Sequence, residues 1–163
     1  MKTMVNLHVR WTIRKDLPSV VDIEELCFEF PWTETEIIDM LRKPHVVGKV
    51  TEYQDGIGGF MFYALHRTGL HVENFAVHPD YRRCGIGTAM VEKLKSKLSP
   101  IKRTSLALDV RESNLDAQLF FRHHGFKAVK VIREAYEDTD EDAYRFAYKI
   151  GTSGLTNISS RVE

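Results

Sequence analysis

The chain has 163 residues, of which 43% are apolar and 10% aromatic, a composition typical of a folded domain and not of a disordered segment. Lys and Arg together number 23, as do Asp and Glu, and this balance argues against a nucleic-acid-binding protein, which usually carries a basic excess. Two cysteines are too few for a disulfide framework, and no stretch suits a signal peptide or a membrane span, so we expect a cytoplasmic protein without membrane contact.

The first part of the chain alternates between strand-like and helix-like patterns. Asp16 is placed to cap a helix, and Thr33 with Glu36 matches a capping box at the start of a second helix, which Pro44 ends. The Asp55-Gly56 turn separates two strand-like runs, which predicts a β-hairpin. The predicted elements are a strand over 6–14, a helix over 16–27, a short helix from 33, and strands over 46–53 and 57–65.

The alternation continues to residue 150. Pro100 stops the helix that begins at Gly85, and Ser113 with Asp116 resembles a second capping box, whose helix Gly125 closes. The predicted elements are a strand over 70–77, a helix from 85, a strand over 104–110, a helix from 113, and strands over 126–132 and 143–150. This order predicts one α/β domain over 1–150, with a mixed sheet of about seven strands and helices on both faces. The polar tail 151–163 is expected to fray.

A glycine-containing turn between the strand 70–77 and the helix from 85 is the most informative segment. Gly85 and Gly87 allow a tight turn with inward-pointing amides, and the helix N-terminus adds partial positive charge, so the turn is suited to phosphate. Arg82 and Arg83 add fixed positive charge beside it. The spacing matches neither the Rossmann GxGxxG pattern nor the GKS/T pattern of a P-loop, which excludes the two commonest phosphate-binding motifs.

The run R-R-x-G-I-G-T over 82–88, preceded by F-A-V-H-P-D-Y over 75–81, resembles the acetyl-CoA pyrophosphate loop of the Gcn5-related N-acetyltransferase (GNAT) family. Further likeness lies in FPW over 30–32, LALDVRESN over 106–114, FFRHHGF over 120–126 and EDAY over 141–144. These segments are similar to the branch of ribosomal-protein alanine N-acetyltransferases (RimI-like) and related protein N-terminal acetyltransferases. The resemblance extends over residues 7 to 150 and implies a GNAT fold and acetyl-CoA-dependent N-acetyl transfer.

The resemblance also implies how acetyl-CoA, as a cosubstrate, would be bound. Backbone amides of the 82–88 run would hold the pyrophosphate, the main chain of residues 75–77 would pair with the pantetheine arm like an added strand, and Asn114 would contact that arm. The residues expected to bind the cosubstrate are Phe75, Ala76, Val77, Arg82, Arg83, Cys84, Gly85, Ile86, Gly87, Thr88, Asn114 and Phe121.

Acetyl transfer to an amine needs a neutral nucleophile, a stabilised tetrahedral oxyanion and a protonated leaving thiolate. Asp109 aligns, by the resemblance, with the general-base Glu of the RimI-like pattern, but it is one methylene shorter and would act through water. Pairing with Arg111 or with a backbone amide is the alternative role for Asp109. Glu73, which precedes the F-A-V core of its strand, is the second candidate base; its alternative is an exposed strand position. Both carboxylates could serve one relay.

The general acid departs from the family pattern. Phe121 stands where the family carries a Tyr that protonates the thiolate, and a phenylalanine cannot donate a proton. Tyr136 or solvent would then supply the proton, or the thiolate would leave unassisted, since a free thiol has a pKa of about 8.5.

By the resemblance, the acceptor site is lined by Phe30, Pro31, Trp32, Tyr136 and Tyr144. The two tyrosines flank the acidic run 137–142, whose negative charge would suit an amine, although a solvated loop and core tyrosines are the ordinary alternatives. The seven histidines have no metal-ligand spacing, so no metal is expected.

Three functions remain open from the sequence. The first is acetylation of the N-terminal α-amine of a protein or peptide, for example a ribosomal protein; an α-amine, with a pKa of about 7.7–8.0, suits a weak base better than a lysine amine near 10.4. The second is acetylation of a small cationic amine, such as a polyamine or aminoglycoside. The third is a non-catalytic CoA-binding module, which Phe121 and the shortened carboxylate would suit. We expect a monomer or a weak dimer.

Overall fold

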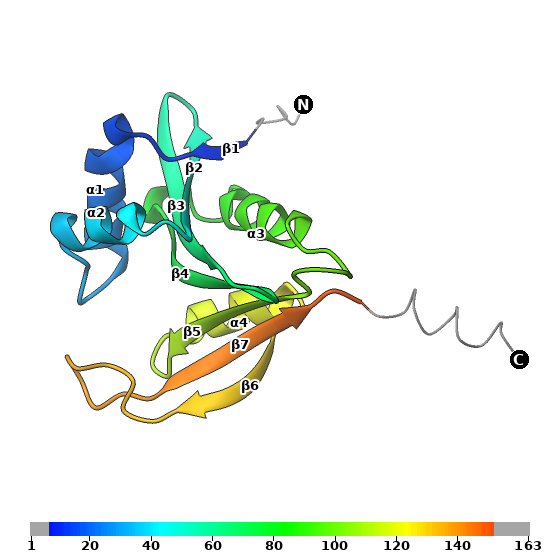
Figure 1. Cartoon of the computed structure of the whole chain (residues 1–163). Helices are drawn as coiled ribbons and strands as arrows, with labels where there is room; N and C mark the ends of the chain where they lie inside the picture. The colour runs from blue at the N-terminus through cyan, green and yellow to red at the C-terminus, as the bar shows by residue number, and fades with distance from the viewer. Residues whose placement is uncertain (1–6, 152–163) are drawn as a thin grey trace, which may run out of the picture.

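The computed structural model describes residues 7–151, so the tail that is predicted to fray lies, from residue 152 on, outside the described residues. Seven strands form one sheet in the order β1-β2-β3-β4-β5-β7-β6 (Figure 1). Neighbouring strands are antiparallel except for the parallel central pair, β4 and β5. This confirms the predicted α/β class with a mixed sheet. The strands are β1 (His8–Trp11), β2 (Val46–Tyr53), β3 (Gly56–Leu65), β4 (Gly69–Val77), β5 (Ser105–Arg111), β6 (Lys127–Ile132) and β7 (Ala143–Lys149).

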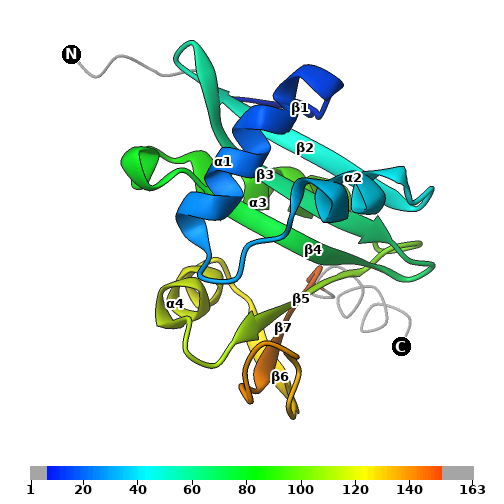
Figure 2. The same cartoon turned by 90° about the vertical axis from the view of Figure 1, so that its left-hand side faces the viewer.

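Helices cover both faces of the sheet, as predicted (Figures 1 and 2). On one face α1 (Leu17–Cys27) and α2 (Glu34–Arg42) bury their apolar side chains against Phe60 and Phe62 of β3. On the other face α3 (Ile86–Ser96) and α4 (Leu115–His123) pack over a second core that contains Leu106 and Leu108 of β5. The short 3-10 helices η1 (Arg14–Asp16) and η2 (Pro79–Tyr81) lie before α1 and α3.

The two central strands separate before they end. β4 and β5 pair only from Gly69↔Ser105 to Val72↔Leu108. Beyond this point β4 still pairs with β3 as far as Val77, and β5 still pairs with β7 as far as Arg111. The register of β3 against β4 also shifts beside Glu73, which marks a β-bulge where the separation begins. The carboxyl-terminal halves of β4 and β5 therefore form a wedge, with one edge of each strand free of the other.

Asp16 is the N-cap residue of α1, as predicted, but its side chain does not cap the helix. Its carboxylate accepts hydrogen bonds from the amide of Ile13 at 2.8 Å and from both terminal nitrogens of Arg10, at 2.8 and 2.9 Å. The guanidinium of Arg10 draws the carboxylate toward β1, which is itself shorter than the predicted strand over 6–14.

The predicted capping box of Ser113 and Asp116 is wrong, because Asn114 is the N-cap of α4. Its Oδ1 accepts a hydrogen bond from the amide of Ala117 at 3.2 Å, and an asparagine is as effective an N-cap as a serine. The capping box of Thr33 with Glu36 at the start of α2 is confirmed, with both reciprocal hydrogen bonds formed.

Candidate active site

The turn before α3 has the backbone geometry of an anion site. Arg83 and Gly85 both adopt left-handed conformations, with φ of +64° and +85°. The first helical hydrogen bond runs from the amide of Ala89 to the carbonyl of Gly85 at 2.9 Å, so the amides of residues 86–88 precede the helical ladder. A turn of this kind directs successive amides toward one point, where the helix dipole adds positive potential. The amides of residues 86–88 therefore lack helical partners, and phosphate binding at this turn stays a prediction.

The two glycines of this turn serve different purposes. Gly85 has space for a side chain, since its nearest heavy atom would be Leu7 Cδ1 at 3.6 Å, but its positive φ favours glycine. At Gly87 a Cβ would lie 2.9 Å from Cζ of Phe120. The space at Gly87 is thus limited by the ring of Phe120 on α4, and Gly87 is not among the residues with positive φ.

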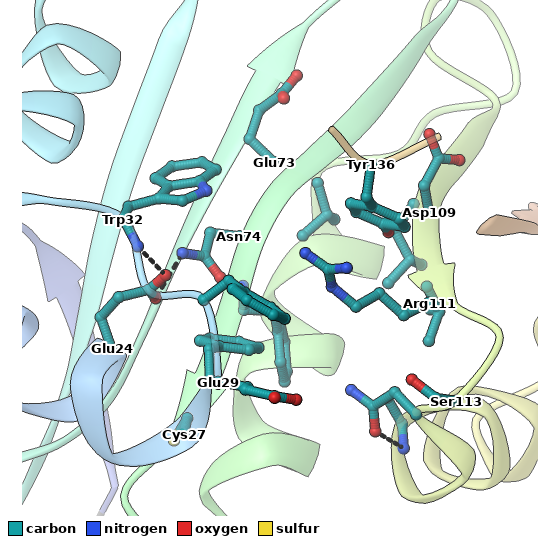
Figure 3. A pocket seen from close by; sticks show the side chains of 18 of the residues that line it. Glu24, Cys27, Glu29, Trp32, Glu73, Asn74, Asp109, Arg111, Ser113 and Tyr136 are labelled. Atoms are coloured by element: carbon teal, nitrogen blue, oxygen red, sulfur yellow. Dashed lines mark hydrogen bonds between the residues drawn. The ribbon is translucent and has the colours of Figure 1, made fainter. Parts of the chain in front are cut away.

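A cavity of about 300 Å³ lies in the wedge between β4 and β5 (Figure 3). Its walls come from α1 on one face of the sheet and from α4 on the other, so the wedge connects the two faces. Of the residues predicted for the site, those that line it are Phe30, Trp32, Glu73, Phe75, Asp109, Asn114, Phe121 and Tyr136. Pro31, Ala76, Val77, Tyr144 and the 82–88 turn are not among the lining residues, and Tyr144 packs against the core beneath α3 and α4.

Asp109, the first candidate base, is held by an arginine of the neighbouring strand. Its two oxygens accept hydrogen bonds from Nε and Nη2 of Arg145, at 2.8 and 3.0 Å. The register of β5 against β7 places these two residues directly opposite each other. The partner is thus Arg145 and not Arg111. His71 Nε2 lies 3.9 Å from the same carboxylate.

Glu73, the second candidate base, lines the cavity beside the bulge of β4 (Figure 3). Its Oε1 lies 3.2 Å from Nδ1 of His71. This hydrogen bond lowers the pKa of the Glu73 carboxyl below its usual value, so the carboxylate form prevails at neutral pH. Since His71 contacts Glu73 at one ring nitrogen and faces Asp109 with the other, it joins the two candidate bases.

Arg111 connects the end of β5 to the acidic loop that precedes β7. Its guanidinium forms two hydrogen bonds with Asp138, at 2.9 and 2.6 Å, and one with Glu141 at 3.1 Å. It also lies over the ring of Tyr136, 3.8 Å from the centroid, and 5.4 Å from that of Phe30. Arg111 therefore holds the predicted acceptor residues of two distant loops on one side of the cavity.

Burial and hydrogen bonds shift the pKa values of Tyr136, Asp138 and Glu141 in this wall. Burial raises the pKa of the Tyr136 hydroxyl, which stays protonated at neutral pH. A hydrogen bond from Arg111 lowers the pKa of the Asp138 carboxyl, and one from Ser113, followed by that from Arg111, lowers the pKa of Glu141. Asp138 and Glu141 are thus ionised and paired with Arg111.

Phe121 stands at the position where the family resemblance implies a proton donor. It is 4% exposed, lines the cavity and packs against the rings of Phe75, Phe120 and Phe126. Among the lining residues, the side chains with a hydroxyl or thiol are Cys27, Ser113 and Tyr136.

Glu24 is a site residue that sequence reasoning missed. It lies on α1, is 2% exposed and lines the cavity. Its carboxylate accepts hydrogen bonds from the amide of Trp32 at 3.1 Å and from Nδ2 of Asn74 at 2.7 Å, and burial raises its pKa (Figure 3). A glutamate in an amphipathic helix ordinarily faces solvent, so its position in the pattern carries no signal of burial.

The cavity is rich in acidic side chains. Five carboxylates line it, from Glu24, Glu29, Glu73, Asp109 and Glu141, together with the guanidinium of Arg111. Within residues 7–151, His, Cys, Asp and Glu side chains form no group of three that could hold a metal ion. In the same part of the chain, no helix combines the length and the apolar character that crossing a bilayer would require.

Comparisons with known proteins agree with this geometry. The family model described as the acetyltransferase (GNAT) family matches residues 17–126. Over 140 residues the chain is 31% identical to the ribosomal protein bS18-alanine N-acetyltransferase of Escherichia coli (strain K12), a match that covers 83% of this chain and 92% of the relative.

Solved structures share the fold. Ard1 from Thermoplasma volcanium is 25% identical and has a TM-score of 0.79, over 89% of this chain and 98% of that one. Arabidopsis thaliana NAA60 in complex with acetyl-CoA is 17% identical and has a TM-score of 0.75, over 89% of this chain and 99% of that one, a likeness of fold alone. The chain therefore belongs to the GNAT acetyltransferase family, and it is an N-acetyltransferase.

Proposed function

We propose that this N-acetyltransferase acetylates the free α-amine at the N-terminus of a protein or peptide, by direct transfer through a tetrahedral intermediate. The observation that carries the proposal is the carboxylate-rich cavity in the wedge, whose walls reach both faces of the sheet. A donor held at the start of α3 and an acceptor entering past the loop 28–33 would meet there from opposite faces. The relative named as a ribosomal protein bS18-alanine N-acetyltransferase supports the same class of acceptor.

The charge of the cavity fits an amine that arrives protonated and must lose a proton. At pH 7 roughly a tenth of an α-amine is already neutral, against about one in 2,500 for a lysine amine, so a weak base suffices for the former. We propose Glu73 as that base, acting directly or through one water, because it lines the cavity and is ionised at neutral pH. Asp109, with both oxygens bound by Arg145, would support His71 and Glu73 electrostatically.

The leaving thiolate needs a proton that Phe121 cannot give. We propose the hydroxyl of Tyr136 as the donor, since it lines the cavity, is protonated at neutral pH and is fixed beneath the guanidinium of Arg111. Acetyl-CoA supplies the activated acetyl group, and the residues of this chain orient the amine, remove its proton and return one to the thiol.

The test is release of CoA thiol from acetyl-CoA with three kinds of acceptor. These are short peptides that differ in their first residue, the same peptides with a blocked N-terminus and an internal lysine, and a panel of polyamines and aminoglycosides. We expect turnover with free N-termini and none with blocked peptides. Turnover with the small amines alone would replace the proposal by the second candidate, which the same carboxylates favour.

A further inference from the structure

Glu24 has a buried carboxyl group for which the proposed chemistry has no direct use. Each of its carboxylate oxygens binds one donor, and the two donors belong to different parts of the site (Figure 3). Oε1 accepts from the amide of Trp32, in the loop that leads from α1 to α2 and lines the acceptor side. Oε2 accepts from Nδ2 of Asn74, on the wedge-facing half of β4. A carboxylate that is 2% exposed cannot give up either donor without a large desolvation cost.

Asn74 also hydrogen-bonds the backbone of β4, so its side chain links Glu24 to that strand. While Nδ2 of Asn74 donates to Glu24, its Oδ1 accepts a hydrogen bond from the amide of Phe75 at 2.8 Å. Pairing between β4 and β5 has already ended at Val72, so the Phe75 amide belongs to the free edge of the wedge. An extended ligand that adds itself to this edge as a strand would require that amide. In this structure the Phe75 amide donates to Oδ1 of Asn74 instead.

A second side chain of α1 meets the same edge. The thiol of Cys27, one helical turn beyond Glu24, lies 3.2 Å from the carbonyl oxygen of Val77. The amide of Phe75 and the carbonyl of Val77 lie on the same side of the strand, since residues two apart repeat their orientation. A strand-like ligand would therefore displace two contacts that involve α1. One is the direct contact of Cys27 with Val77, and the other is the contact of Asn74 with Phe75, which connects to Glu24.

We infer that Glu24 is a positioning residue that couples the donor edge of β4 to the acceptor loop through Asn74 and Trp32. When a ligand takes the Phe75 amide, Oδ1 of Asn74 is released, whereas the bond from Nδ2 to Glu24 has to persist because the carboxylate is buried. The resulting shift of Glu24 reaches the amide of Trp32. Binding of the donor thereby changes the loop that receives the amine. The inference rests on the proposed function, because it takes this edge of β4 as the place where the CoA arm binds.

The fluorescence emission of Trp32 itself can report a change in the acceptor loop. The chain has two tryptophans, and Trp11, which is 63% exposed on β1, can be replaced by Phe to leave Trp32 as the single reporter. In this W11F background, Glu24→Gln is compared with Glu25→Gln, an exposed neighbour on the same helix that serves as the matched control. Asn74→Ala is the second test variant; it breaks the link to Phe75 and leaves the contact between Glu24 and Trp32 in place. CoA is titrated against each variant, with calorimetry for affinity and Trp32 emission for the loop.

We expect CoA to change the emission of Trp32 in the background protein and in Glu25→Gln. In Glu24→Gln and in Asn74→Ala this change in emission should be largely lost, because the link between the edge of β4 and Trp32 is broken. An undiminished Trp32 response in both test variants would overturn the inference alone, since CoA would then act on Trp32 directly. Absence of CoA binding to the background protein would overturn the proposed function as well.

Discussion

Glu73 and Asp109 carry the same charge but differ in what already binds it. Both oxygens of Asp109 accept hydrogen bonds from Arg145, whereas Glu73 shares one oxygen with His71 and faces the cavity. Because Arg145 already occupies both oxygens of Asp109, an amine or a water would have to displace the guanidinium to reach them. The difference in partners therefore assigns different roles to the two candidate bases.

Glu73→Gln is expected to lower kcat by about a hundredfold, the lower end of what a positioned general base contributes, and Asp109→Asn by about tenfold. Steady-state thiol release with a free-N-terminal peptide measures both, and calorimetry with CoA checks that donor binding is retained. A larger loss of kcat in Asp109→Asn than in Glu73→Gln would reverse the assignment.

Tyr136 is the proposed proton donor, and Tyr144, which packs against the core and not in the cavity, is the matched control. Tyr136→Phe should lower kcat by about tenfold or more with little change in the affinity for CoA, because only a hydroxyl is removed. Tyr144→Phe should leave kcat within about twofold. Equal kcat values in the two variants would mean that solvent protonates the thiolate.

At the scale of the elements, the turn before α3 depends on one backbone conformation. Gly85→Ala introduces no clash but forces a side chain into the left-handed region, at a cost of about 1–2 kcal/mol. Relaxation of that strain should turn the amides of residues 86–88 and raise the Kd for CoA by about tenfold. Calorimetry measures this change, and a Kd equal to that of the unmodified protein would contradict the assignment of the turn.

Gly87→Ala provides a contrast within the same turn. Its Cβ would meet the ring of Phe120 at 2.9 Å, so the substitution should lower the free energy of unfolding by about 1–3 kcal/mol through overpacking. Chemical denaturation measures this loss. An unchanged stability would mean that the ring of Phe120 moves aside at no cost.

The start of α1 is tied to β1 by the ion pair of Asp16 and Arg10, which lowers the pKa of the Asp16 carboxyl from its usual 3.8. Because the folded-state pKa is depressed, the pair stabilises the fold above pH 3.8, and its contribution is lost as pH falls through the folded pKa. Asp16→Asn should cost about 1.5–3 kcal/mol at pH 7, the range for hydrogen bonds to charged groups. Urea unfolding at pH 7 and pH 3 tests this, and a penalty that does not shrink at the lower pH would contradict it.

At the scale of the whole molecule, elements are predictable from the sequence where the signal is local. The capping box of Thr33 and Glu36 and the hairpin signal at Asp55-Gly56 lie within a few residues of the structures they specify. The capping box and the hairpin of β2 and β3 both appear in the fold, although the turn itself is formed by Gln54 and Asp55 and Gly56 already belongs to β3. The side chain of Asp16 does not cap α1 because Arg10 binds its carboxylate, and Ser113 does not cap α4 because Asn114 takes the N-cap position.

The site is predictable only in part, because several of its contacts join residues that lie far apart in the sequence. Glu73 and Asp109 could be located from strand patterns, but the partner of Asp109 depends on β7 pairing with β5, a contact between residues 36 positions apart. Similarly, the burial of Glu24 results from packing α1 against the bulged half of β4, 50 residues away. No local pattern encodes either contact, so the supporting network of the site emerges only from the assembled sheet.

The most direct test is a crystal structure of the protein with CoA. The phosphates should lie within hydrogen-bond distance of the amides of residues 86–88, and the arm should run along the free edge of β4, with a ligand atom in place of Asn74 Oδ1 at the amide of Phe75. CoA bound with its arm outside the wedge, or with its phosphates away from the start of α3, would contradict this description of the active site.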